Sequence, residues 1–187
     1  MRRLIRSAAV LAVMSTLAAC VSTPAPTYQP SIANLQSLRS GTAMIGVDAF
    51  TANEGVSNRS FVLRGSTMSG SGVDGTFSTY LQEALEAELR NAGRFGDAAA
   101  LRLSGTLTTN RLNAAGISTG DGAVGARFVL TRDGQVVYDK ELTGEHQWPS
   151  SFIGAVAIPA AVQGYPATVE KLISLLFADP DFIAATR

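Results

Sequence analysis

Two segments of the chain space their apolar residues like amphipathic helices. In residues 77–92, every fourth position from Phe77 to Leu89 is apolar, and charged side chains lie between these positions. In residues 166–177 the apolar positions recur every three or four residues, at Val169, Leu172, Ile173, Leu176 and Phe177. Each pattern predicts a helix that buries one face in a core. Gly93 and the pair Asp179-Pro180 mark the expected helix ends.

Apolar and polar residues alternate with the period of a β-strand in five further segments. These segments are residues 43–50, 60–64, 101–109, 124–131 and 135–143. The last two flank Arg132-Asp133-Gly134, which predicts a hairpin with its glycine in a left-handed bulge position and Arg127 opposite Asp139. A two-residue turn would instead set Arg127 against Lys140, and the like charges disfavour that register.

The order β-β-α-β-β-β-α predicts an α+β fold in which two amphipathic helices pack on a mostly antiparallel sheet. We expect residues 42–187 to form this single domain and the Gly/Ser-rich residues 64–75 to be a mobile loop. Residues 20–41 carry three prolines among small and polar residues, which predicts an extended tether. Such a tether would span about 25 Å as a coil and about 60 Å as a polyproline helix.

The first twenty residues resemble the export signal of a bacterial lipoprotein. Three arginines within the first six residues precede an apolar run, and the run closes with Leu17-Ala18-Ala19-Cys20, which resembles a lipobox. The run is shorter than the about 20 apolar residues that cross a bilayer. We therefore expect residues 1–19 to be a signal peptide that is cleaved between Ala19 and Cys20. A plain secretory signal with an incidental cysteine is the alternative.

The lipobox resemblance implies that Cys20 carries a thioether-linked diacylglycerol and an N-acyl chain such as palmitate. Three acyl chains anchor a protein far more firmly than one chain, which binds membranes only marginally. The next residue is Val21, whereas an aspartate at this position is the usual signal for retention at the inner membrane. The resemblance thus implies a Gram-negative protein on the periplasmic face of the outer membrane.

Composition narrows the choice of partners. Without residues 1–19 the chain has 168 residues, which is enough for one domain with a hydrophobic core. It would carry 12 basic and 15 acidic side chains, since three of the 15 basic residues lie in the signal. Without a basic excess we expect no nucleic-acid partner. Cys20 is the only cysteine, which leaves neither a disulfide nor a thiol nucleophile.

Two glycine-rich segments and one acidic helix face resemble functional motifs only in part. Residues 70–75 match G-x-G-x-x-G, the pattern of a dinucleotide-binding loop. In that site an acidic residue at the end of the next strand binds the ribose, and the predicted strand at residues 101–109 has none. We therefore expect a flexible loop and no cofactor. Residues 120–125 repeat the spacing ahead of a predicted strand, where a helix N-terminus is missing. Glu83, Glu86 and Glu88 are expected on the solvated face of their helix.

His146 is the only histidine, which disfavours a metal site and leaves one candidate general base. A periplasmic hydrolase that uses His146 is therefore the alternative to a binding protein. No G-x-S-x-G motif supports it.

The uncharged segment from Ser151 to Val162 (SFIGAVAIPAAV) follows Trp148-Pro149. Gly154 and Pro159 argue against one long regular element there. The segment is either buried under the helices or forms an apolar surface for a partner protein or the membrane. In the second case the binding residues would be Trp148, Phe152, Ile153 and Ile158.

The order and spacing of these features are similar to those of the YajG-like family of small Gram-negative outer-membrane lipoproteins. The similarity rests on the lipobox, the proline-rich segment, the strand at residues 43–50, the helix FSTYLQEALEAELRNAG, the hairpin and the terminal helix. Auxiliary lipoproteins of lipid-transport ABC systems and the lipopolysaccharide-assembly lipoprotein share a similar coarse plan. The family brings no established activity. With a firm anchor and no catalytic set, we expect a non-enzymatic binding or assembly accessory module with an envelope protein as partner, in an oligomeric state that the sequence leaves open.

Overall fold

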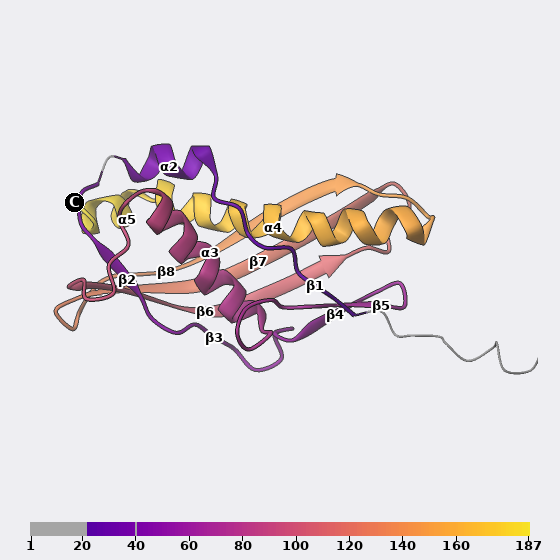
Figure 1. Cartoon of the computed structure of the whole chain (residues 1–187), viewed down its shortest axis with the longest axis horizontal. Coiled ribbons are helices and arrows are strands. Elements are labelled where there is room, and N and C mark those ends of the chain that lie inside the picture. The colour runs from indigo at the N-terminus through magenta and orange to yellow at the C-terminus, as the bar shows by residue number, and fades with distance from the viewer. Residues whose placement is uncertain (1–21, 40) are drawn as a thin grey trace, which may run out of the picture.

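The computed structural model describes residues 22–39 and 41–187. Figure 1 shows an elongated molecule whose long strands and longest helix follow the long axis. The helices are α2 (Ile32–Leu38), α3 (Phe77–Asn91), α4 (Gly154–Ala178) and α5 (Pro180–Ala185). The strands are β1 (Ser22–Pro24), β2 (Ile45–Val47), β3 (Thr51–Ala52), β4 (Ser60–Leu63), β5 (Ser66–Ser69), β6 (Leu101–Asn113), β7 (Thr119–Arg132) and β8 (Gln135–Pro149).

The main sheet has the strand order β2-β6-β7-β8, and β3 also pairs with β6. Strands β6, β7 and β8 are antiparallel, whereas β2 and β3 run parallel to β6. Helix α4 packs across β7 and β8, and α3 packs near β2, β3 and β6 (Figure 1). The predicted α+β fold with helices on a sheet is confirmed. The sheet is mixed, because its short first strands join in parallel.

The core lies between the helices and the main sheet. The apolar faces of both predicted helices, residues 77–92 and 166–177, contribute to it. Leu85 of α3 and Leu176 of α4 are fully buried. Helix α3 begins after Thr76, whose side-chain oxygen accepts a hydrogen bond from the backbone N–H of Thr79. It ends before Gly93, whose φ of 68° lies in the left-handed region that favours glycine.

The predicted hairpin forms between β7 and β8, but the predicted register is wrong. Asp133-Gly134 adopts φ angles of 50° and 80° and makes a two-residue turn. Continued unchanged, this register would set Arg127 against Lys140. A bulge shifts the ladder by one residue, so that Arg127 faces Glu141 instead. Arg127 still reaches its predicted partner, since its Nε donates to Oδ1 of Asp139 at 2.7 Å.

Helix α4 begins earlier than its apolar pattern predicts. It starts at Gly154 and includes Pro159 and Pro166, so the expectation of a break in this segment is wrong. Pro159 lacks the N–H that would bind the carbonyl of Ala155. Both residues are exposed, so water can bind this carbonyl and the helix continues.

A glycine lets α4 lie close to the sheet. A Cβ atom added at Gly144 of β8 would lie 2.3 Å from the backbone nitrogen of Leu172. The strand and the helix therefore touch through their backbones at this point. Any larger residue at position 144 would push α4 away from β8.

Residues 22–38 pack against the domain, so the prediction of a free tether is wrong for this stretch. Strand β1 runs parallel to β5 in a small sheet of order β1-β5-β4. Tyr28 and Leu38 are 7% and 2% exposed. Strand β5 lies within residues 64–75, so the prediction of a mobile loop is also wrong there. Apolar side chains among the prolines supply the burial that the overall composition does not suggest.

A buried carboxylate holds this N-terminal segment. Glu88 of α3 is fully buried, contrary to the expected solvated position. Its Oε1 accepts hydrogen bonds from the Tyr28 hydroxyl at 2.7 Å, the Ser31 N–H at 3.0 Å and the Asn34 side-chain amide at 2.8 Å. The Ser174 hydroxyl of α4 donates to Oδ1 of the same Asn34 at 2.8 Å. The segment is thus fastened to both long helices.

Candidate functional site

Three loops meet around Arg64 at one end of the molecule. Arg64 lies in the turn between β4 and β5 and has a φ of 50°. Its Nε donates to the carbonyl oxygen of Ala114, and its Nη1 to that of Phe152, both at 2.6 Å. Its Nη2 donates to the carbonyl oxygens of Ala115 and Gly116 at 3.1 and 3.0 Å. One guanidinium therefore ties the β4–β5 turn to the β6–β7 and β8–α4 loops.

Large apolar side chains are exposed around these three loops. We call this surface the apolar end and define it by Val62, Ile117, Phe152, Ile153 and Val156. Their exposed fractions are 79%, 76%, 72%, 49% and 53%. The segments that carry them are residues 62–67, 112–120 and 147–158, in which Arg64 is the only charged residue. A clustered apolar surface of this kind marks an interaction site.

The structure separates the four residues that the sequence offers as partner-binding. Phe152 and Ile153 lie on the apolar end. Trp148 is only 7% exposed and lies against Gly164 of α4, and Ile158 is half-buried and packs against the core. The uncharged segment thus contains both alternatives, with surface at its start and core further on. The sequence does not single out Val62, which stands between Phe61 and Leu63 in a predicted strand, or Ile117, which is a lone large apolar residue among small and polar ones.

Strand β1 brings the start of the described chain to this same end. Ser22 pairs with Thr67, close after the turn that holds Arg64. Because β1 and β5 are parallel, Ser22, the first residue of β1, is the residue of this strand that lies nearest the turn (Figure 1). Ala19 and Cys20, the predicted cleavage and lipidation sites, lie outside the described residues. Two residues of chain place Cys20 within about 7 Å of Ser22.

His146, the candidate general base, lies in β8 opposite Gly122. It is half-buried, and its ring centroid lies 5.9 Å from that of Trp148. Within residues 22–39 and 41–187 no serine hydroxyl or carboxylate is hydrogen-bonded to its ring. The hydrolase alternative gains no support from this geometry.

The glycine-rich residues 70–75 form an ordered connection into α3. Oδ1 of Asp74 accepts hydrogen bonds from the backbone N–H and the hydroxyl of Thr76, each at 2.9 Å. These bonds, the backbone one first, lower the pKa of Asp74. A hollow of about 190 Å³ beside the loop is lined by Gly72, Tyr80 and Glu83, among others. The carboxylates of Asp74 and Glu83 would repel the phosphates of a dinucleotide.

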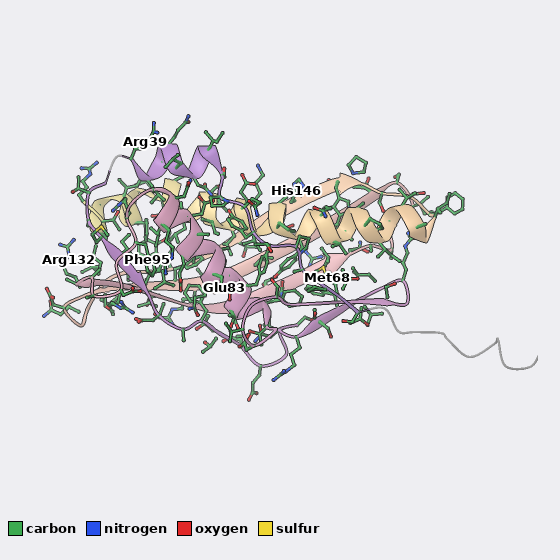
Figure 2. The ribbon with its side chains drawn as sticks, in the orientation of Figure 1. Arg39, Met68, Glu83, Phe95, Arg132 and His146 are labelled. Atoms are coloured by element: carbon green, nitrogen blue, oxygen red, sulfur yellow. The ribbon has the colours of Figure 1, made fainter. Side chains whose placement is uncertain are left out.

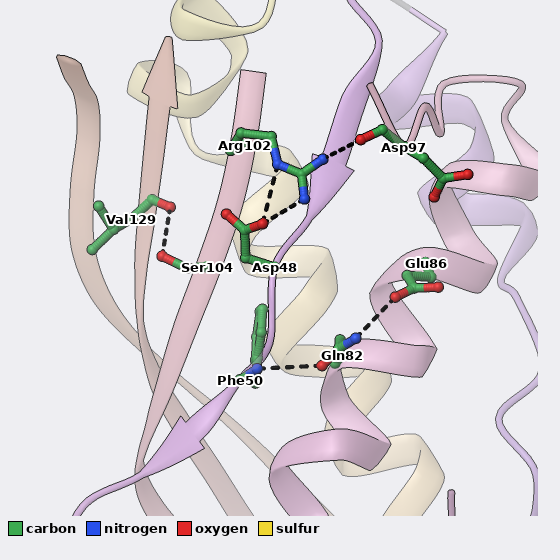
Figure 3. A network of polar contacts seen from close by, with 8 residues as sticks. All are labelled: Asp48, Phe50, Gln82, Glu86, Asp97, Arg102, Ser104 and Val129. Atoms are coloured by element: carbon green, nitrogen blue, oxygen red, sulfur yellow. Dashed lines mark hydrogen bonds and ion pairs between the residues drawn. The ribbon is translucent and has the colours of Figure 1, made fainter. Parts of the chain in front are cut away.

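The opposite end of the sheet is charged, and we call it the charged end. Arg102 forms an ion pair with Asp48 and donates to the backbone carbonyl of Asp97 at 2.6 Å (Figure 3). Arg132, labelled in Figure 2, and Arg187 line a hollow of about 340 Å³ at this end. These charged side chains thus gather at the extremity that lies opposite the apolar end.

The described residues contain no group of three or more His, Cys, Asp or Glu side chains that could hold a metal ion. Nor does any helix in this part of the chain combine the length and the apolar character that crossing a membrane requires.

Comparisons with known proteins support the fold. No family model and no curated protein sequence matches the chain. A Xanthomonas campestris protein of family DUF330 is similar in structure, with a TM-score of 0.57 and 15% identity over 84% of this chain and 95% of that one. A candidate lipoprotein from Caulobacter crescentus aligns with a TM-score of 0.48 and 17% identity over 82% of this chain and 97% of that one. The first likeness shows a shared fold over most of this chain and almost the whole of the Xanthomonas protein.

Proposed function

We propose that this chain is a lipid-anchored accessory module of the Gram-negative envelope, held on the periplasmic face of the outer membrane through acylated Cys20. The observation that carries the proposal is the position of the lipobox-like Leu17-Ala18-Ala19-Cys20, which ends two residues before the domain begins at Ser22. An anchor at this position holds a folded domain directly at a membrane. A fold shared with a DUF330 protein is compatible with this role.

The proposed activity is binding or assembly of another envelope component, without catalysis. In support, the apolar end exposes five large apolar side chains, and Arg64 is the only charged residue in the three segments that carry them. Apolar surfaces of this kind bind, whereas catalysis needs positioned acids, bases or nucleophiles. The YajG-like assignment and an envelope protein as partner belong to the same proposal.

The anchor is tested by Cys20→Ala in cells. We expect the variant to keep its signal peptide, and mass spectrometry should show no added mass from acyl chains. The reason is that alanine has no sulfur atom to form the thioether with diacylglycerol. If the acyl mass were still present in the Cys20→Ala variant, the proposed anchor would be refuted.

Val21→Asp tests the outer-membrane location, because the resemblance implies that an aspartate at this position retains the protein at the inner membrane. Density-gradient separation of the two membranes measures the shift.

The non-enzymatic role is tested with the purified lipidated protein on panels of ester, peptide and glycan substrates. We expect no turnover. Turnover that disappears in His146→Ala would establish the hydrolase alternative.

A further inference from the structure

We propose that the apolar end of the domain lies on the lipid surface that holds Cys20, with Ile117, Phe152 and Ile153 inserted among the headgroups. The inference rests on the proposed acylation of Cys20. It narrows the proposed binding role, because it assigns the apolar end to a lipid surface and leaves an envelope protein partner to bind elsewhere on the domain. That lipid surface is the anchoring leaflet itself.

The short chain between the anchor and the domain gives the first argument. Ser22 begins β1 beside Thr67, near the turn that holds Arg64. Cys20 lies at most about 7 Å of chain away from Ser22. An acylated Cys20 must therefore draw this part of the domain to the bilayer surface. The burial of Tyr28 and Leu38 leaves no free stretch after Ser22 that could let the domain stand off.

The chemistry of the surface brought there gives the second argument. The apolar end holds five of the eleven exposed large apolar side chains of the described residues, and each of the five is about half exposed or more. Membrane-surface segments insert apolar side chains to about 5–10 Å at the headgroup boundary. Charged side chains would oppose this insertion, and Arg64 is the only one in the three segments. Its guanidinium is occupied by four backbone carbonyls.

The shape of the molecule gives the third argument. Helix α4 starts at the apolar end and runs for 25 residues along the long axis (Figure 1), a length of about 37 Å. The ion pair of Arg102 with Asp48 and the side chain of Arg132 lie toward the other extremity. Contact through the apolar end therefore keeps these charges in water. The domain would stand upright on the leaflet.

The test uses the mature lipidated protein in vesicles of phosphatidylethanolamine and phosphatidylglycerol. A single Phe152→Cys substitution carries an environment-sensitive fluorophore, and acylated Cys20 has no free thiol to label. Val136→Cys is the matched control, because Val136 is also an exposed apolar residue, at 60%, and lies at the hairpin of the charged end. Nitroxide-bearing lipids quench fluorophores inside the bilayer, and iodide quenches those in water.

We expect the label at position 152 to lose at least about half of its fluorescence to nitroxides placed at about 5–10 Å depth, and the label at position 136 to lose almost none. The inference would be overturned if iodide quenched the label at position 152 and the nitroxide-bearing lipids did not. A label protected from both quenchers would also overturn it, because a second copy or a protein partner would then cover the apolar end. A protein that lacks acyl mass and does not stay on the vesicles would refute the proposed anchor, and the inference with it.

A double variant, Phe152→Ser with Ile153→Ser, gives a second measurement. Both side chains are exposed, so the melting temperature should stay within about 2 °C. With the label now placed by Ile117→Cys, the double variant should show at most half of the lipid quenching seen without it. Unchanged quenching at position 117 would show that Phe152 and Ile153 do not hold the loops in the membrane.

Discussion

The hydroxyl of Tyr28 donates a hydrogen bond to the carboxylate of Glu88 at 2.7 Å. This contact joins the N-terminal segment to α3, in a place where Glu88 is closed to solvent. Burial, and then the hydrogen bond to Glu88, raise the pKa of Tyr28, so its hydroxyl remains a donor over the physiological range. A segment with the composition of a linker is thus an integral part of the domain.

Glu88→Ala should be strongly destabilising. It removes the acceptor of the Tyr28 hydroxyl, the Asn34 amide and the Ser31 N–H, and buried donors without partners cost about 1–3 kcal/mol each. We expect a loss of about 3 kcal/mol or more in urea unfolding. Glu83→Ala, on the exposed face of the same helix, should stay within about 0.5 kcal/mol. Equal losses in the two variants would contradict the role of Glu88.

Leu85→Ala and Leu176→Ala should each cost about 2–5 kcal/mol, the usual range for a buried leucine. Both side chains are fully buried, one in each long helix. Leu175→Ala is the control, because Leu175 neighbours Leu176 but is 46% exposed. Thermal and urea unfolding measure the differences. A loss below about 1 kcal/mol for either buried leucine would argue against a shared core.

Gly144→Ala should separate α4 from β8. The new methyl group would lie 2.3 Å from the backbone nitrogen of Leu172, which cannot rotate away as a side chain does. We expect a loss of about 1–3 kcal/mol in unfolding free energy, as for other overpacked sites. Gly154→Ala adds the same methyl group 3.8 Å from Cδ1 of Ile158. It should leave stability unchanged or raise it, since alanine favours helix.

The ion pair between Lys140 and Asp179 should make stability depend on acid pH. Burial opposes the charged form of Asp179, yet hydrogen bonds from Lys140 and from the backbone N–H groups of Asp181 and Phe182 outweigh it and lower its pKa. The folded state thus binds this proton less readily than the unfolded state. The contribution is present above about pH 4, the ordinary pKa of aspartate, and is lost as the pH falls.

Asp179→Asn keeps the helix cap of α5 and removes the charge. The melting temperature of the variant should lie below that of the parent protein at pH 6, and the gap should close as the pH falls toward 3. Asp181→Asn should show a smaller gap, because Asp181 is 78% exposed and lies 3.5 Å from Lys140. A gap for Asp179→Asn that does not change with pH would disprove the link.

The elements that could be predicted are those with a local signal. The leucine spacing of α3, the alternation in β6 and the position of the hairpin turn at residues 132–134 each lie within a few residues of sequence, although the turn type was predicted wrongly. The hairpin register was missed because the bulge that moves Arg127 away from Lys140 leaves no mark in composition.

The features that could not be predicted depend on contacts between distant segments. Glu88 has the spacing of a solvated residue, and only the return of Tyr28 and Asn34 over α3 buries it. Arg64 likewise reads as an ordinary loop cation until the structure places carbonyls of two other loops around it. For the apolar end, the sequence offered Phe152 and Ile153, and only the fold brings Ile117 beside them.

The hydrogen bond from Ser174 to Asn34 joins residues 140 positions apart. A chain that emerges from its N-terminus must therefore wait for α4 before the first segment can complete its contacts. Non-local pairing of this kind slows folding, because a long loop has to close first. During synthesis, the N-terminal residues would remain exposed to proteases and chaperones until almost the whole chain has been made. Premature termination within α4 would leave the segment next to Cys20 without its partners on the last helix.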